Sequence, residues 1–274
     1  MAAAVLDFWT SDWPALSGCL RNHSKDETPN LLERPFLKMG ELIVQLPWLT
    51  GLQNNRTAAI NNLRRVGSKR SEVNKETSRI EQRLGALFAQ RGFQVKAGWM
   101  PDRDTYGDAG EVDLICAMDG IVLVIEVKSS YLRKTQREAW AHASTTLRKA
   151  GNQLQRKTTA LMHALTMDAR LCTDLGLQPG IVPPLTGWIV DTSIELDHER
   201  FSGFLKVSLE EVIIALRNDR HLLSEPYGIP EAIQDGGNLD VADQALHQAT
   251  SLYPQSFSAA RFVDVIESEA VWSI

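Results

Sequence analysis

The chain has 274 residues, of which 43% are hydrophobic and 23% are charged, and its formal net charge at pH 7 is −5. This composition is typical of a globular protein with a sizeable core, and the apolar runs are too short to cross a bilayer. Three widely spaced cysteines argue against a disulfide framework or a cysteine zinc site, and the sequence lacks a phosphate loop, a dinucleotide-binding glycine motif and a serine-hydrolase elbow.

The N-terminal segment MAAAVLDFWTSDW has no positively charged leader and carries Asp7 and Asp12 within its apolar run. This pattern argues against a secretory signal, so we expect a cytoplasmic protein without membrane contact. Residues 1–70 are expected to form a mostly helical extension. Within it, the sequence TAAINNLRRVG has the spacing of a helix over 59–66 that ends at Gly67.

The next segments alternate between helix and strand patterns. A helix is expected over 71–90, followed by strands at 93–100, 111–118 and 121–129, the last two joined by the hairpin dipeptide Asp119-Gly120. A long helix is expected to begin near Thr135, with Thr135 and Glu138 as a capping box and an apolar face from Trp140 to Leu161.

Two further strands, at 186–194 and just before Ser208, and a helix capped by Ser208 complete this pattern. The order of elements predicts an α/β fold with a mixed sheet and helices on its faces. The acidic residues 221–274 are expected to form a helical C-terminal extension packed on the core.

Positive charge is concentrated around the hairpin, although the chain is acidic overall. Residues 128–157 carry eight Lys or Arg and one Glu, a local net charge of +7, and residues 55–79 carry seven bases and two acids, a local +5. From residue 191 onward there are fifteen acids and five bases, a local −10. The two basic segments are candidate surfaces for nucleic-acid phosphates, and solvated helix faces are the alternative interpretation.

The Asp119-Gly120 turn predicts the register of the hairpin. With these two turn residues, opposed positions sum to 239, which places Asp113 opposite Glu126, and Glu111 opposite Lys128, on one face of the sheet. Opposed Cβ atoms lie roughly 4.5–5.5 Å apart, so the two carboxylates would grip one small cation. Such carboxylates repel each other without one, and Mg²⁺, or Mn²⁺ in its place, suits oxygen ligands of this kind.

The spacing of Asp113, twelve intervening residues and then Glu126-Val127-Lys128 resembles the PD-(D/E)XK nuclease superfamily over about residues 71–218. Val112 stands where the name of the family has proline, and the competing pair Pro101-Asp102 lies in a polar loop out of register with Glu126. The resemblance implies a restriction endonuclease-like core over 71–220, with a helix, a three-stranded meander, a helix and a further strand. It also implies Mg²⁺-dependent hydrolysis of DNA phosphodiester bonds, by an endonuclease in preference to an exonuclease.

The resemblance also implies roles for individual residues. Asp113, Glu126 and the carbonyl of Val127 become metal ligands, and Lys128 activates the attacking water or stabilises the anionic transition state. Glu81, on the helix before the first strand, is a further catalytic and metal-ligand candidate, with a capping-box pairing to Ser78 as the alternative. Accessory candidates are Gln153, which a solvated helix face would equally explain, and Glu111, for which an ion pair with Lys128 is the favoured role.

The candidate nucleic-acid-binding side chains all follow the hairpin: Arg133, Lys134, Arg137, Arg148, Lys149, Arg156 and Lys157. Tyr131 and Trp140 are candidates for stacking on bases, with packing against the core as the favoured alternative. The alternative function is a non-catalytic nucleic-acid- or protein-binding module of the same fold, and a third interpretation is a solvated hairpin with a structural ion pair. RNA stays open as a substrate, as do a homodimer or larger complex and the choice among restriction, recombination and repair.

Overall fold

The structure is a computed structural model that describes residues 10–14, 17, 36–45, 70–130, 133, 136–218 and 251–272. The chain divides into two compact units, Met1–Glu72 and Val73–Ile274. Among the described residues, no helix is long and apolar enough to cross a membrane.

The described part of the first unit contains a small sheet. Strand β1 (Thr10–Asp12) pairs in parallel with β2 (Phe36–Met39), which pairs in antiparallel fashion with β3 (Leu42–Gln45). Gly40, with a φ of 63°, allows the tight reversal between β2 and β3. Our expectation of a mostly helical extension over residues 1–70 did not include this sheet, and the helix expected at 59–66 lies outside the described residues.

The described part of the second unit is built on a mixed six-stranded sheet of order β4-β5-β6-β7-β9-β8. Its strands are β4 (Gln94–Trp99), β5 (Val112–Met118), β6 (Ile121–Lys128), β7 (Leu185–Asp191), β8 (Arg200–Phe201) and β9 (Phe204–Ser208). Strands β4 to β6 form an antiparallel meander, β6, β7 and β9 run parallel, and β8 runs antiparallel to β9. The predicted α/β fold with a mixed sheet is confirmed.

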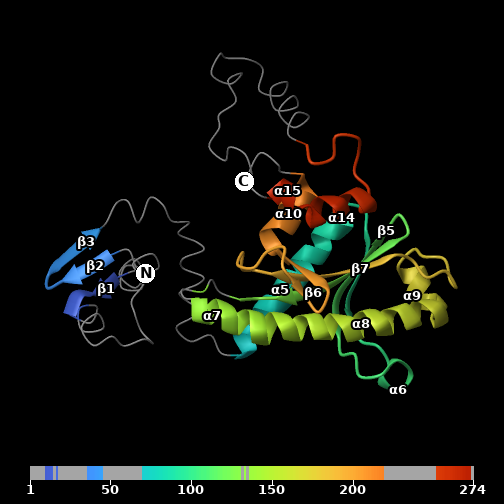
Figure 1. Cartoon of the computed structure of the whole chain (residues 1–274), viewed down its shortest axis with the longest axis horizontal. Helices are drawn as coiled ribbons and strands as arrows, with labels where there is room; N and C mark the ends of the chain where they lie inside the picture. The colour runs from blue at the N-terminus through green and yellow to red at the C-terminus, as the bar shows by residue number, and fades with distance from the viewer. Residues whose placement is uncertain are drawn as a thin grey trace, which may run out of the picture. The chain divides into compact units, whose positions relative to one another are not determined.

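Helices cover both faces of this sheet (Figure 1). On one face lie α5 (Arg70–Gln90), α10 (Leu209–Arg217) and α14 (Ala259–Glu267), and on the other lie α8 (Arg148–Met167) and α9 (Ala169–Asp174). Because side chains alternate along a strand, Leu114 and Ile125 pack toward the first face and Ile115 and Val124 toward the second. The same alternation sends Asp113 and Glu126 toward α8.

The C-terminal part of the chain contributes to the core of the second unit. Phe262 and Ile266 of α14 are fully buried, and the Phe262 ring meets those of Phe88 and Trp188 at centroid distances of 5.6 Å. Helix α15 (Glu269–Trp272) follows α14. The expected C-terminal extension therefore packs on the core over its described residues 251–272, while 221–250 lie outside the described ranges.

The long basic helix is not uniformly α-helical. It begins as α7 (Gln136–Ala141), passes through the π-helical stretch η1 (His142–Leu147) and continues as α8. Trp140 is 71% exposed, whereas Leu147 and Leu154 are buried, so the predicted packing of Trp140 against the core is wrong. The wider π-helical turns rotate α7 relative to α8, which removes Trp140 from the buried face. Tyr131 and the predicted cap Thr135 lie outside the described residues.

Candidate functional site

The hairpin of β5 and β6 has the register that its turn predicts. Met118 pairs with Ile121 and Leu114 with Ile125, so these opposed positions sum to 239. Asp119 and Gly120 both have positive φ, 54° and 76°, as this tight turn requires. At the open end of the hairpin, Asp113 Oδ2 accepts a hydrogen bond of 2.7 Å from the backbone N–H of Val127, which fixes this carboxylate beside Glu126.

Two lysines meet the two carboxylates of the hairpin. Lys128, also on β6, donates from Nζ to Glu126 Oε1. Lys157, which reaches the hairpin from α8, donates from Nζ to Asp113 Oδ1 at 3.0 Å and to Glu126 Oε2. We call Asp113, Glu126, Lys128 and Lys157 the carboxylate–lysine cluster. The predicted convergence of Asp113, Glu126 and Lys128 on one face is present, and Lys157 joins them.

The carboxylate–lysine cluster is buried at one end and open at the other. Glu126 and Lys157 are 2% and 3% exposed, whereas the side chain of Lys128 is 24% exposed. Burial and repulsion from Glu126 raise the pKa of Asp113, although Lys157 opposes the change. Burial disfavours the charged form of Lys157, but attraction from Glu126 and Asp113 outweighs it and raises the pKa of this ammonium. The ammonium of Lys157 is therefore held in its charged form.

Glu81 lies within electrostatic reach of this cluster. Partial burial, followed by repulsion from Asp113, Glu111 and Glu126, raises the pKa of Glu81 to about 7. Its alternative role as a capping-box partner of Ser78 is excluded, because α5 begins at Arg70 and Ser78 lies within the helix. The raised pKa of Glu81 shows that several carboxylates lie close together here, and such a group favours the binding of a cation.

The other accessory candidates have different outcomes. The favoured ion pair between Glu111 and Lys128 is wrong, because Lys128 binds Glu126 and Glu111 precedes the first residue of β5. Gln153 is half-buried on α8, one turn before Lys157 and on the same side of the helix. The rejected candidate Asp102 is exposed and caps the short helix α6 (Arg103–Tyr106), where it accepts a hydrogen bond from the Thr105 N–H at 3.1 Å.

The predicted phosphate-binding residues separate into two groups. Arg137, Arg148, Lys149 and Arg156 are exposed on α7 and α8. Arg133 instead turns inward: its side chain is 6% exposed, and its guanidinium contacts His142 Nδ1 at 2.6 Å and Glu195 at 3.5 Å. Arg133 and Lys157 are therefore not surface ligands for phosphate, and Lys134 lies outside the described residues.

A second buried polar network, which was not predicted from the sequence, adjoins the cluster on β7. Asp191, which pairs in register with Lys128, accepts hydrogen bonds from Ser193 Oγ at 2.8 Å and from His142 Nε2 at 2.9 Å. Because arginine only donates, His142 Nδ1 is the acceptor in its contact with Arg133, and Nε2 is the ring nitrogen that donates to Asp191. Burial raises the pKa of Asp191, but the hydrogen bonds from His142, Ser130 and Ser193 outweigh it and lower that pKa. The network anchors the segment after Lys128 to the π-helical stretch.

Comparison with known proteins gives no match: the chain matches no family model, no curated protein and no solved structure.

The donor set of the cluster can be tested against the expected Mg²⁺. Among the described residues, no group of three or more His, Cys, Asp and Glu side chains has the spacing of a metal site. Asp113 and Glu126 nevertheless supply the hard oxygen ligands that Mg²⁺ takes, and Glu81 adds a third carboxylate within electrostatic reach. The chemistry of these residues fits a divalent cation, while the ammonium of Lys157 bridges the two carboxylates.

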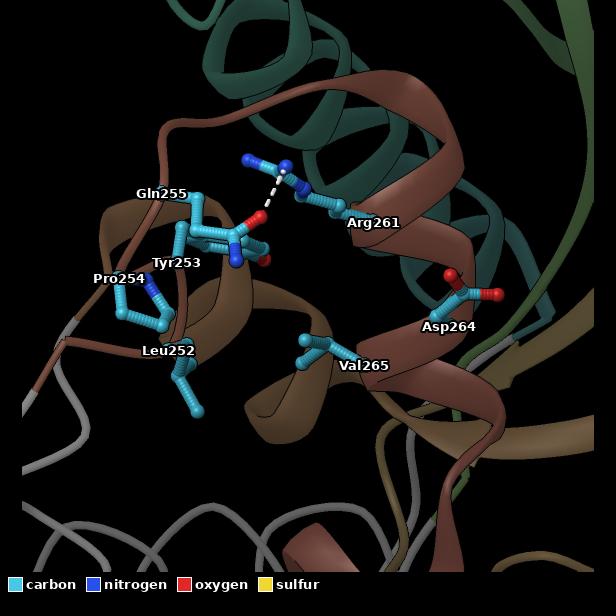
Figure 2. Close-up of a pocket in the computed structure, with 7 residues that line it drawn as sticks. All are labelled: Leu252, Tyr253, Pro254, Gln255, Arg261, Asp264 and Val265. Atoms are coloured by element: carbon cyan, nitrogen blue, oxygen red, sulfur yellow. Dashed lines mark hydrogen bonds between the residues drawn. The ribbon is translucent and has the colours of Figure 1, made fainter.

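A pocket elsewhere in the second unit is separate from this cluster (Figure 2). It has a volume of about 160 Å³ and lies between α14 and the segment that precedes it, with Tyr253, Gln255 and Arg261 in its wall. Arg261 donates to Gln255 Oε1 at 2.6 Å, so the guanidinium already has a partner within the wall. None of the residues that line this pocket belongs to the carboxylate–lysine cluster.

Proposed function

We propose that this protein is a metal-dependent nuclease that hydrolyses DNA phosphodiester bonds, with the restriction endonuclease-like core of the PD-(D/E)XK superfamily. The observation that carries the proposal is the convergence of Asp113, Glu126 and Lys128 on one sheet face at the open end of the hairpin. The order α5, β4, β5, β6, α8, β7 supports it, because it is the order expected of that core.

In this proposal Asp113, Glu126, the carbonyl of Val127 and Glu81 hold Mg²⁺, or Mn²⁺ in its place. When bound, the ion supplies Lewis-acid chemistry, which makes a water more acidic and offsets charge on a phosphoryl oxygen. Lys128 is the more exposed lysine of the cluster, so its ammonium can contact a phosphate or the attacking water. Gln153 and Glu111 are accessory groups beside the site.

Exposed basic side chains on α7 and α8 provide the contacts with the DNA backbone: Arg137, Arg148, Lys149 and Arg156. Each phosphate that such a side chain neutralises releases counterions, so binding is expected to weaken steeply as salt concentration rises. These contacts do not distinguish DNA from RNA. RNA is therefore included among the substrates in the cleavage assay below.

A second function, a non-catalytic nucleic-acid- or protein-binding module, is favoured by one specific observation. All four carboxylate oxygens of Asp113 and Glu126 already accept hydrogen bonds, from Lys157, Lys128 and the Val127 N–H. The cluster is thus satisfied without a metal ion. This alternative predicts DNA or protein binding that a chelator does not change, with no cleavage.

The nuclease proposal is tested by incubating the full-length protein with supercoiled, linear, single-stranded and branched DNA, and with RNA, in Mg²⁺ or Mn²⁺, with EDTA controls. Glu126→Gln and Lys128→Met are expected to lower the cleavage rate by about 10²-fold or more, because each removes charge at the reacting phosphate. Glu199→Gln makes the same change as Glu126→Gln at an exposed position and is expected to cleave at the wild-type rate. Equal trace cleavage by wild type and both site variants would show that the catalytic assignment is wrong.

A further inference from the structure

Lys157 occupies a position in α8 that its helix pattern assigns to the core. The side chains of α8 that are buried against the sheet recur every three or four residues, and Lys157 lies in this stripe between Leu154 and Leu161. A buried ammonium is strongly disfavoured unless carboxylates pair with it. The contacts of Lys157 therefore have to account for its presence there.

Those contacts place a positive charge where the hairpin register predicts a cation. Lys157 Nζ bridges Asp113 Oδ1, at 3.0 Å, and Glu126 Oε2. Lys157 is 44 and 31 residues from these partners in the sequence, so the contact depends on how α8 packs on the sheet. With two carboxylates and two ammonium groups, the cluster has a formal net charge of zero. An arriving divalent ion would meet occupied oxygens and two like charges.

We infer that Lys157 is a built-in counter-cation, which holds Asp113 and Glu126 together in the metal-free protein and competes with a divalent ion for the same oxygens. This inference rests on the proposed function, because it takes those oxygens as metal ligands. For the ion to bind, the ammonium has to leave Asp113 Oδ1 and Glu126 Oε2, while Lys128 can keep its bond to Glu126 Oε1. The flexible four-carbon stem of lysine permits this withdrawal without a movement of α8.

Isothermal titration calorimetry with MnCl₂ on full-length protein, without DNA, tests the competition. Lys157→Met keeps the apolar length of the side chain and removes its charge, and Lys157→Gln keeps a hydrogen-bond donor without the charge. Both variants are expected to bind Mn²⁺ about tenfold or more tightly than wild type, because a repelling charge is gone and no ammonium competes for the carboxylate oxygens. Their melting temperatures are expected to fall in EDTA, and added Mn²⁺ is expected to raise them more than it raises that of wild type.

Lys96→Met is the matched control for this titration. It likewise removes a lysine from a carboxylate partner, Asp174, at 2.8 Å, but on the partly exposed surface of β4. Its Mn²⁺ affinity is expected to stay within about twofold of the wild-type value, because a solvated charge is well screened.

The outcomes separate this inference from the nuclease proposal. If wild type binds Mn²⁺ and both Lys157 variants bind it no more tightly, Lys157 is a structural ion pair and the inference is wrong, while the metal site stands. If wild type and all variants fail to bind Mn²⁺, both proposals fail. If the variants bind and wild type does not, the competition is supported in its strongest form.

If both Lys157 variants fail to fold, the inference is tested on the wild-type protein. NMR of lysine side chains labelled with ¹⁵N follows the ammonium of Lys157, whose signal is identified by its loss in Lys157→Arg. Titration with Mg²⁺ is expected to shift or broaden this signal, because the ammonium leaves its carboxylate partners. The inference is rejected if this signal stays unchanged at an Mg²⁺ concentration at which calorimetry shows that the wild-type site is saturated.

Discussion

At the scale of single residues, the carboxylates in and beside the cluster repel one another. Glu81, Asp113 and Glu126 lie within electrostatic reach of one another, and the ammonium of Lys157 offsets only part of their repulsion. The pKa of Glu81, about 7 in the folded protein, lies above its ordinary value of 4.5. Ionisation of Glu81 therefore favours the unfolded state, and this cost appears as the pH rises from about 4.5 through 7.

Glu81→Gln is accordingly expected to stabilise the metal-free protein at pH 8.5 and to change little at pH 5. We expect a gain of about 1 kcal/mol at pH 8.5, a value reduced for the partial solvent exposure of this side chain. Urea denaturation in EDTA at both pH values measures it. Glu199→Gln, the same change at an exposed position, serves as the control. An equal gain from Glu81→Gln at pH 5 and pH 8.5 would argue against a crowd of acids at this site.

At the scale of elements, the position of α8 on the sheet depends on one close backbone approach. A Cβ at Gly151 would lie 2.3 Å from the backbone oxygen of Phe201 in β8, a distance that no side chain tolerates. This glycine lets α8 lie close to the strand, and α8 in turn carries Lys157 to the hairpin. The helix that supplies Lys157 to the cluster is thus positioned by Gly151, which precedes Lys157 by six residues in the same helix.

Gly151→Ala is expected to destabilise the protein by about 1–3 kcal/mol, as overpacking does, although alanine has the higher helix propensity. Gly85→Ala in α5 is the matched control, because its new Cβ would meet only side chains, at 3.3 and 3.4 Å, which can adjust. Urea denaturation compares the two variants with wild type. A Gly151→Ala variant as stable as Gly85→Ala would show that α8 does not depend on this approach.

At the scale of the whole molecule, residues far apart in sequence share the core of the second unit. Phe262 of α14 is fully buried and packs edge-on against Phe88 of α5, with an interplanar angle of 89°. The segment that carries Phe262 follows the last strand of the sheet by about fifty residues, so the core is complete only when this segment has docked.

Phe262→Ala is expected to destabilise the protein by about 3–5 kcal/mol, the usual cost of the cavity that a buried phenylalanine leaves. Met167→Ala, at a side chain that is 70% exposed, is expected to cost less than about 0.5 kcal/mol. Thermal and urea denaturation of both variants provide the comparison. If Phe262→Ala were as mild as Met167→Ala, α14 would be a peripheral addition to the second unit.

The sequence by itself determined the features that depend on neighbours along the chain. The Asp119-Gly120 turn set the register of the hairpin, and the period of two along its strands sent Asp113, Glu126 and Lys128 to one face. Such features are readable because turn chemistry and side-chain alternation act over a few residues. The main order of the second unit, a helix, three strands, a helix, two strands and a helix, followed from the same local patterns, whereas the short elements α6, α9 and β8 were not predicted.

Only the tertiary structure decided which distant side chains complete the cluster. Lys157 lies in a run of basic residues that looks like a solvated surface, and it enters the cluster because the packing of α8 on the sheet turns it inward. Arg133 turns inward because its guanidinium joins a network with His142. Trp140 turns outward because the π-helical stretch rotates α7 relative to α8. These outcomes depend on the rotation and position of whole elements, which local periodicity does not fix.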